Sequence, residues 1–168
     1  MKNSEILKKC KKIKLVICDV DGVLTDGSMY YSENGEQMKK FHTRDGMAVE
    51  LLLKCKIPTL IITGEKSKIV LARAKKIKIK KTYIGIKQKE LLLPQICKSF
   101  KVTTNEIAVI GDDLNDEKIM KSIGLSVCPS NTVKRIKKIA NFITSVPGGE
   151  GVLRELADTI ILSQSIKS

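Results

Sequence analysis

The sequence predicts a three-layer α/β fold, in which a mostly parallel sheet is covered by helices on both faces. Two observations predict it. Short β-branched apolar runs alternate along the chain with segments whose apolar residues recur at helical spacing. Acidic, glycine and hydroxyl residues directly follow several of these runs, as expected where parallel strands end beside a binding crevice. We expect residues 1–168 to form one domain, with a β-hairpin at 27–42.

The first half of the chain begins with a buried strand over 13–18 (IKLVIC), which ends in acidic and glycine residues. Glu33-Asn34-Gly35 then separates segments 28–31 and 37–41, and Asn-Gly is a strong hairpin signal. The next expected elements are a helix over 46–55, a strand over 57–62, a helix over 66–76 and a strand over 82–84.

The second half continues the alternation with a helix over 89–100. Pro94 lies inside this helical pattern, so it either kinks the helix or resets its start. The remaining expected elements are a strand over 106–110, a helix over 115–122, a strand over 125–127, a basic helix from 132, a strand over 142–144 and a helix over 151–162.

The net charge of +13 over 168 residues raises the alternative of a nucleic-acid-binding protein. In the densest basic stretch, 73–81, basic residues alternate with alanine and isoleucine, as in an amphipathic helix that runs into a strand. Aromatic residues make up only 4% of the chain and do not interleave with the lysines to stack on bases. We therefore expect no nucleic-acid partner, and a positive field that attracts a small anionic substrate.

The cysteines and the apolar runs indicate the cellular compartment of the protein. The five cysteines are scattered and never form a C-x-x-C pair, which argues against a disulfide scaffold or a zinc site. No apolar run approaches the roughly 20 residues that cross a bilayer, and the basic segment 1–14 does not resemble a signal peptide. We expect a cytoplasmic protein with no membrane contact.

Polar residues that could carry chemistry follow four of the expected strands. They are Asp19-x-Asp21-Gly22, Thr63-Gly64, Lys89 and Gly111-Asp112-Asp113-x-x-Asp116, in chain order. Carboxylates that converge on one crevice raise one another's pKa unless a cation neutralises them. Hard oxygen ligands of this kind suit magnesium. The chain has a single histidine, which argues against a zinc hydrolase. It contains no G-x-x-x-x-G-K-[ST] loop, which argues against an NTPase of that class.

These four motifs, in this order, resemble those of the haloacid dehalogenase (HAD) superfamily, over almost the whole chain. More narrowly, the chain is similar to the capless branch that contains 3-deoxy-D-manno-octulosonate 8-phosphate phosphatase and 2-keto-3-deoxynononate 9-phosphate phosphatase. The similarity rests on DVDGVLTDG (19–27), the hairpin, TRDG (43–46), GDDLND (111–116), and GGEG (148–151) with Arg154-Glu155. It implies a Rossmann-like, HAD-like fold with a protruding hairpin and no cap domain. A phosphoaspartate receiver module is the alternative from another class, but its acids occur in a different order.

The resemblance implies a magnesium-dependent phosphomonoesterase that works through an aspartyl-phosphate. Asp19 is the implied nucleophile, and Asp21 protonates the leaving alkoxide and then activates water. Thr63 and Lys89 neutralise the phosphoryl oxygens. The implied Mg²⁺ ligands are Asp19, the backbone carbonyl of Asp21 and Asp112, with Asp116 supporting the site; Asp113 is either a ligand or a support.

The resemblance also implies the substrate class, a phosphorylated 2-keto-3-deoxy sugar acid. Glu65 and Lys76 favour the nine-carbon substrate, because eight-carbon enzymes usually carry Arg after the Thr-Gly pair; the eight-carbon alternative stays open. The expected substrate-binding residues are Thr25, Arg44, Gly64, Glu65 and Lys76, with Arg44 pairing with a substrate carboxylate. The hairpin is expected to assemble a homotetramer in which a neighbouring subunit completes the active site.

Overall fold

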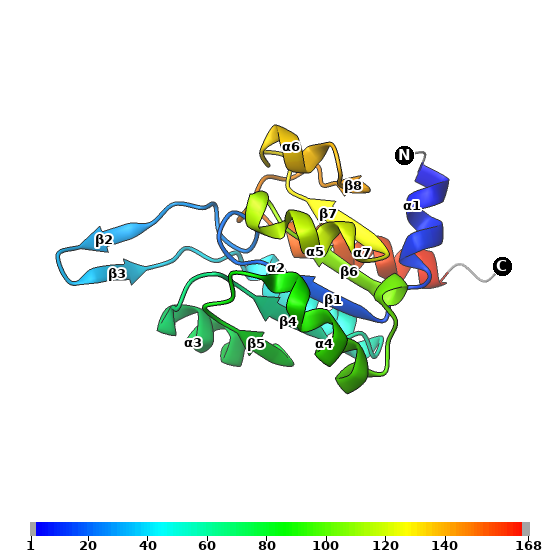
Figure 1. The fold of residues 1–168 in the computed structure, drawn as a ribbon, viewed down its shortest axis with the longest axis horizontal. Coiled ribbons are helices and arrows are strands. Elements are labelled where there is room, and N and C mark those ends of the chain that lie inside the picture. Colours follow the sequence, from blue (N-terminus) through cyan, green and yellow to red (C-terminus); the bar gives the residue numbers. More distant parts are fainter. Residues whose placement is uncertain (1–2, 166–168) are drawn as a thin grey trace.

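Six parallel strands form the central sheet of the computed structural model, which describes residues 3–165 (Figure 1). Their bounds are β1 Leu15–Cys18, β4 Thr59–Ile62, β5 Lys81–Tyr83, β6 Ile107–Ile110, β7 Leu125–Cys128 and β8 Phe142–Ile143. They lie in the order β5-β4-β1-β6-β7-β8, and every neighbouring pair is parallel. The carboxyl ends of the strands therefore share one edge. The strand order reverses beside β1, and a crevice at that position is where such sheets bind ligands.

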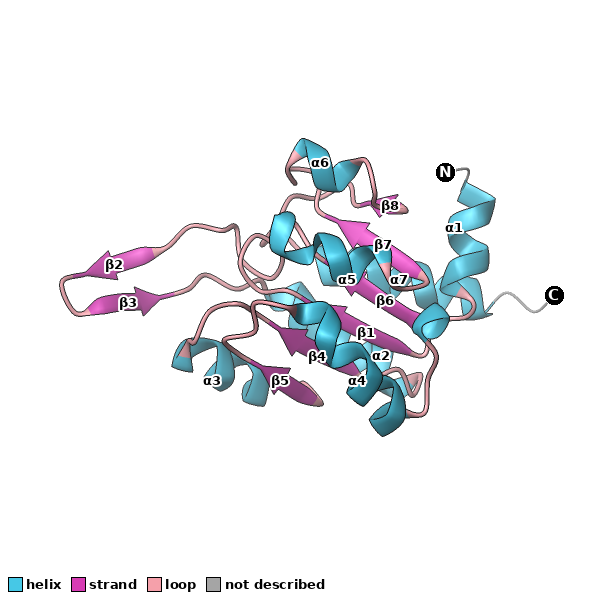
Figure 2. Ribbon diagram, in the orientation of Figure 1, coloured by secondary structure: helices cyan, strands magenta, loops and turns pink. Residues whose placement is uncertain are grey.

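Helices cover both faces of the sheet (Figure 2). One face carries α1 Asn3–Cys10, α2 Thr43–Lys54, α3 Lys68–Lys76 and α7 Val152–Ser165. The other carries α4 Leu93–Phe100, α5 Glu117–Lys121 and α6 Lys134–Lys137. Side chains of β1 alternate between the two cores, with Val16 and Cys18 in one and Leu15 and Ile17 in the other. The predicted three-layer α/β fold is confirmed.

The hairpin projects away from the body of the molecule (Figure 1). It consists of β2 Tyr30–Ser32 and β3 Gly35–Met38, which pair antiparallel with an irregularity between Tyr30 and Tyr31. Gly35 takes a φ of +94°, a left-handed value that suits glycine at the turn. The Asn-Gly signal therefore located the ribbon correctly.

Two features of the helices differ from the simplest expectation. The segment predicted as a helix over 89–100 is a 3₁₀ turn, η1 Lys89–Leu92, followed by α4, with Pro94 in the first turn of α4. Pro94 thus resets the helix start, as proline favours early helical positions. The basic N-terminal segment also forms α1, which the sequence did not predict; buried Cys10 packs into the core shared with α7.

Short 3₁₀ turns also precede β6 and α5, at η2 Thr104–Glu106 and η3 Leu114–Asp116. All five cysteines are free thiols; three of them are buried. Within residues 3–165, none of the helices combines the length and the apolar character needed to cross a membrane.

Candidate active site

Asp19 stands at the carboxyl end of β1, where the strand order reverses. Its backbone N–H donates to the carbonyl of Ile110 at 3.0 Å, so the end of β1 is tied to β6. The side chain is only 6% exposed. Burial of this apolar strand therefore carries a carboxylate to the floor of the crevice, where water has little access.

Lys89 supplies the cation beneath this carboxylate. Its side chain is 2% exposed, and Nζ lies 2.8 Å from Asp19 Oδ1 and 2.6 Å from Asp116 Oδ1. The contact with Asp116 is a hydrogen bond, whereas the contact with Asp19 is an ion pair without hydrogen-bond alignment. Asp116 Oδ2 accepts from the backbone N–H of Asp112 at 3.1 Å. Asp116 therefore orients both Lys89 and the loop that carries Asp112.

The charges of these acids are poorly balanced by one lysine. Burial, and then the charge of Asp116, raise the pKa of Asp19 to about 8, although Lys89 lowers it in part. Burial and the charge of Asp116 likewise raise the pKa of Asp112 to about 7. Burial opposes the charged form of Lys89, but the charges of Asp19 and Asp116 outweigh it and raise its pKa. Lys89 alone therefore does not neutralise the carboxylates of Asp19, Asp112 and Asp116.

A divalent cation fits this arrangement. Carboxylate oxygens of Asp19, Asp112 and Asp116 lie within 4.8 Å of one another. The Asp19 oxygen that faces Lys89, Oδ1, is buried and accepts no hydrogen bond, so a metal ion would satisfy this carboxylate further. Hard oxygen donors on a half-open crevice suit Mg²⁺, which keeps water and substrate phosphate among its ligands. Asp19 and Asp112 would hold the metal. Because Lys89 and a backbone N–H already engage Asp116, that residue supports the site.

Two glycines allow the loop after β1 to approach its neighbours this closely. Gly22 has a φ of +81°, and a Cβ at this position would lie 2.0 Å from Oδ2 of Asp112. A Cβ on Gly148 would lie 2.0 Å from the carbonyl oxygen of Gly22. The Gly148–Gly151 motif therefore packs against the loop after β1, and the N–H of Gly149 donates to the carbonyl of Val23 at 3.0 Å.

A cavity of about 480 Å³ opens above Asp19. Its lining brings together most of the predicted chemistry: Asp19, Asp21, Gly22, Gly27, Thr63, Gly64, Glu65, Asp112, Asp113, Leu114 and Asn115. Buried Thr63 lies at the end of β4, and its hydroxyl accepts from the N–H of Glu65 at 3.3 Å. Asp113 caps the following turn, since its Oδ1 accepts from the N–H of Leu114 at 2.7 Å. The volume is within the usual range for a small-molecule site.

Three of the expected substrate-binding residues do not line this cavity. Thr25 is buried, and its hydroxyl accepts from the N–H groups of Gly22 and Gly27, so it braces the loop from within. Arg44, in the first turn of α2, lines a different hollow formed with α7. Lys76, in the last turn of α3, lines a hollow against α2. Neither Arg44 nor Lys76 lines the cavity above Asp19 of its own chain.

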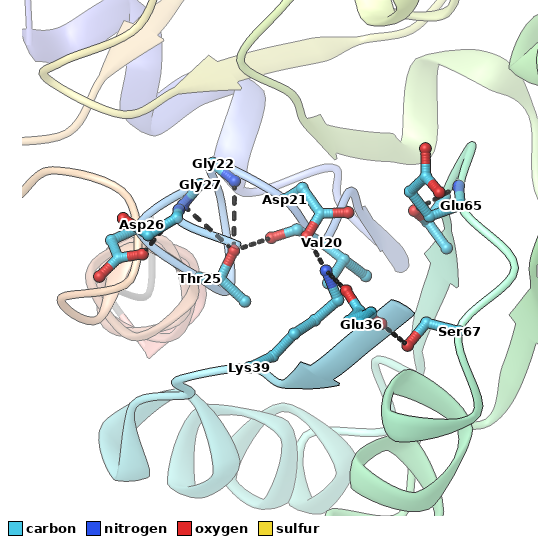
Figure 3. Close-up of polar contacts among 12 residues, drawn as sticks. Val20, Asp21, Gly22, Thr25, Asp26, Gly27, Glu36, Lys39, Glu65 and Ser67 are labelled. Carbon is cyan, nitrogen blue, oxygen red and sulfur yellow. Dashed lines mark hydrogen bonds and ion pairs between the residues drawn. The ribbon is translucent and has the colours of Figure 1, made fainter. Parts of the chain in front are cut away.

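Sequence reasoning missed a set of residues that reaches Asp21 from the hairpin (Figure 3). Lys39 Nζ lies 2.6 Å from Asp21 Oδ1 and 2.6 Å from Glu36 Oε1. The hydroxyl of Ser67, the N-cap residue of α3, donates to Glu36 Oε2 at 2.6 Å. Burial opposes the charged form of Lys39, but the hydrogen bonds to both carboxylates raise its pKa. The sequence around Lys39 did not distinguish this residue from its neighbours, because most lysines near it in the chain are solvated.

Comparison with known proteins identifies the family of this site. The family model described as haloacid dehalogenase-like hydrolase matches residues 80–156. The 3-deoxy-D-manno-octulosonate 8-phosphate phosphatase of Escherichia coli K12 is 35% identical over 162 residues, which are 96% of this chain and 86% of that enzyme. The chain belongs to the haloacid dehalogenase-like hydrolases. Both the resemblance and the predicted enzyme class, a phosphomonoesterase of this superfamily, are thereby confirmed, and the receiver-module alternative is wrong.

Solved structures of this hydrolase family agree in fold over nearly the full length. The cobalt-bound deoxy-D-mannose-octulosonate 8-phosphate phosphatase of Haemophilus influenzae has a TM-score of 0.90 at 36% identity, over 93% of this chain and 91% of that one. The 3-deoxy-D-manno-octulosonate 8-phosphate phosphatase of Moraxella catarrhalis, in complex with magnesium ion, phosphate ion and KDO, has a TM-score of 0.92 at 34% identity, over 96% and 92%.

Proposed function

We propose that this hydrolase is a magnesium-dependent phosphatase that removes phosphate from a 2-keto-3-deoxy sugar acid. The supporting observation is the buried carboxylate of Asp19, which faces the cavity with Lys89 on one side and the Asp112 carboxylate near it. A nucleophile, a fixed cation and a second acid at one point are what phosphoryl transfer needs.

In the proposed reaction, an Asp19 oxygen attacks phosphorus while the ester P–O bond breaks. Asp21 gives its proton to the departing alkoxide, and the phosphoryl group remains on Asp19. Asp21, now a carboxylate, takes a proton from water as the water attacks phosphorus and frees Asp19. Lys89, the Thr63 hydroxyl and the N–H groups after β4 stabilise the equatorial oxygens. Bound Mg²⁺ would neutralise the phosphate and the Asp19 and Asp112 carboxylates.

The eight-carbon ester, 3-deoxy-D-manno-octulosonate 8-phosphate, is the substrate that we propose first. Its support is the name of the E. coli relative and the KDO held by the M. catarrhalis structure. The nine-carbon ester remains a second candidate because Glu65 lines the cavity. Lys76, the other residue that favours the nine-carbon ester, lies outside the cavity of its own chain. Arg44 and Lys76 would therefore contact substrate only from a neighbouring subunit.

A homotetramer built through the hairpin is part of this proposal. The ribbon exposes Met29, Tyr30, Tyr31 and Met38, whose exposed fractions run from 44% to 63%. An isolated two-stranded ribbon with apolar side chains in water is marginally stable, and a second copy of the ribbon would cover them.

The test is phosphate release by the purified chain from the eight-carbon and nine-carbon esters, in MgCl₂ and in EDTA. We expect release from at least one ester only when the metal is present, and none from Asp19→Asn. A wild-type chain that hydrolyses neither ester would overturn the proposal. A higher kcat/KM on the nine-carbon ester would reverse the order of the two candidates.

A further inference from the structure

Lys39 is the most deeply enclosed charge of the hairpin region. It directly follows β3, and its side chain is 0% exposed. The next residue, Lys40, has a side chain that is 54% exposed and lies 3.3 Å from Glu150 and 3.8 Å from Asp26. Desolvating an ammonium group is costly unless it is paired and hydrogen-bonded. Lys39 meets that condition through two carboxylates, Asp21 and Glu36, each at 2.6 Å.

The two carboxylates around Lys39 differ in what else they do. Glu36 is held from behind by the Ser67 hydroxyl at 2.6 Å, so it is anchored to the start of α3. Asp21 lies on a glycine-containing loop and lines the cavity. Lys39 contacts only Oδ1 of Asp21, and the other carboxylate oxygen points away from Lys39 (Figure 3). The chain Ser67–Glu36–Lys39 therefore fixes the rotation of the Asp21 carboxylate from outside the loop.

We propose that Lys39 is a positioning residue for proton transfer by Asp21, and that Glu36 and Ser67 hold Lys39 in place. This inference rests on the proposed phosphatase function. Lys39 donates to Oδ1, which leaves the other oxygen of Asp21 to carry the proton that passes to the leaving alkoxide. The same oxygen later accepts a proton from the attacking water. The hairpin thereby takes part in the chemistry of its own subunit.

A leaving-group comparison separates this role from a structural one. A sugar alkoxide needs a proton as it departs, whereas p-nitrophenolate leaves as a stable anion and needs little help from a general acid. The ratio kcat/KM reports steps up to cleavage of the ester bond. We expect Lys39→Met to lower kcat/KM about 100-fold on 3-deoxy-D-manno-octulosonate 8-phosphate and less than about 5-fold on p-nitrophenyl phosphate. The adjacent control, Lys40→Met, should leave both values near wild type.

Equal losses on the two esters, or no loss on either, would overturn the role of Lys39 while leaving the phosphatase proposal intact. A wild-type chain inactive on both esters would overturn the proposed function and this inference with it. If Lys39→Met unfolds, Glu36→Gln carries the same comparison, because it loosens Lys39 but keeps the ammonium group. We expect Glu36→Gln to show a smaller loss in the same direction, and equal losses on both esters would again count against the proposal.

Discussion

Lys89 Nζ lies 2.8 Å from Oδ1 of Asp19, and both side chains are almost fully buried. The pair joins the end of β1 to the 3₁₀ turn after β5, two segments that are 70 positions apart in the sequence (89 − 19). In the proposed reaction, a nucleophile and a cation fixed in this way would require no rearrangement when negative charge develops on the phosphoryl group.

Lys89→Met should therefore lower kcat about 1000-fold. It should also lower the Tm of the metal-free protein, because loss of one partner from a buried ion pair typically costs about 3–5 kcal/mol. Phosphate-release assays and thermal denaturation in EDTA measure the two effects. Lys118→Met is the matched control, since Lys118 is exposed and lies 3.6 Å from Glu90. An active, fully stable Lys89→Met variant would contradict the role of Lys89.

Magnesium should stabilise the protein more at pH 8 than at pH 5. Burial and Asp116 raise the folded-state pKa of Asp19 to about 8 and of Asp112 to about 7, from ordinary values of 3.8. Between about pH 4 and pH 8 the folded state binds more protons than the unfolded state, so the contribution of these groups to stability falls as pH rises. Mg²⁺ binds their ionised forms and offsets that loss.

The measurement is the Tm shift on adding MgCl₂ at each pH. Asp112→Asn should lose most of the shift at pH 8, whereas Asp158→Asn, which alters an exposed ion pair with Arg154, should keep it. Equal shifts at pH 5 and pH 8 would count against a metal held by Asp19 and Asp112.

Gly22→Ala should abolish magnesium binding. Its added methyl would lie 2.0 Å from Oδ2 of Asp112, and the backbone at φ +81° is strained for alanine. Gly35→Ala is a close control, because Gly35 has a similar φ of +94° but nothing within 4 Å of the new methyl. Both variants carry strain of about 1–2 kcal/mol, so only Gly22→Ala should lose the magnesium-dependent Tm shift and activity. Equal losses of the magnesium-dependent Tm shift and of activity in the two variants would show that backbone strain alone causes them.

Glu65→Arg should shift substrate preference toward the eight-carbon ester. Glu65 lines the cavity just after Thr63 and Gly64, so a change of charge there would act directly on the proposed substrate. The measurement is the ratio of kcat/KM for the eight-carbon and nine-carbon esters. Glu5→Arg, on the exposed surface of α1, should leave that ratio unchanged. An unaltered ratio in Glu65→Arg would remove the reason for considering the nine-carbon substrate.

Tyr31→Glu combined with Met38→Glu should break the proposed tetramer. These side chains are 63% and 59% exposed on the ribbon, and burying two added charges between copies would be costly. Light scattering after size-exclusion chromatography gives the mass directly. Val133→Glu, at a 41% exposed apolar position outside the hairpin, is the control. A wild-type monomer, or a double variant that remains a tetramer, would count against the hairpin as the interface.

Some parts of the site could be predicted from the sequence because they depend on local order. Strands end where β-branched runs stop, and in a parallel sheet those ends meet, so Asp19, Thr63 and Asp112 had to share an edge. The hairpin was predictable for the same kind of reason, since Asn34-Gly35 specifies a turn by its own backbone preferences. Lys89 was predicted from its motif position, and the structure adds its two carboxylate partners.

Arg44, Lys76 and Lys39 could not be assigned in this way. Arg44 and Lys76 lie on α2 and α3, and they line hollows formed with α7 and α2 rather than the cavity above Asp19. Lys39 and Lys40 are adjacent lysines with the same local signal, yet one is enclosed by Asp21 and Glu36 and the other faces solvent. Their difference depends on which of the two lysines faces the loop that carries Asp21.

The sequence by itself determined the sheet, the hairpin and the acids and lysine that gather at the strand ends, because backbone preferences and apolar periodicity act over a few residues. Only the tertiary structure decided which charges are desolvated and which are paired. The free energy of a charge depends on how completely packing removes water from it, and that packing comes from segments far apart in the chain.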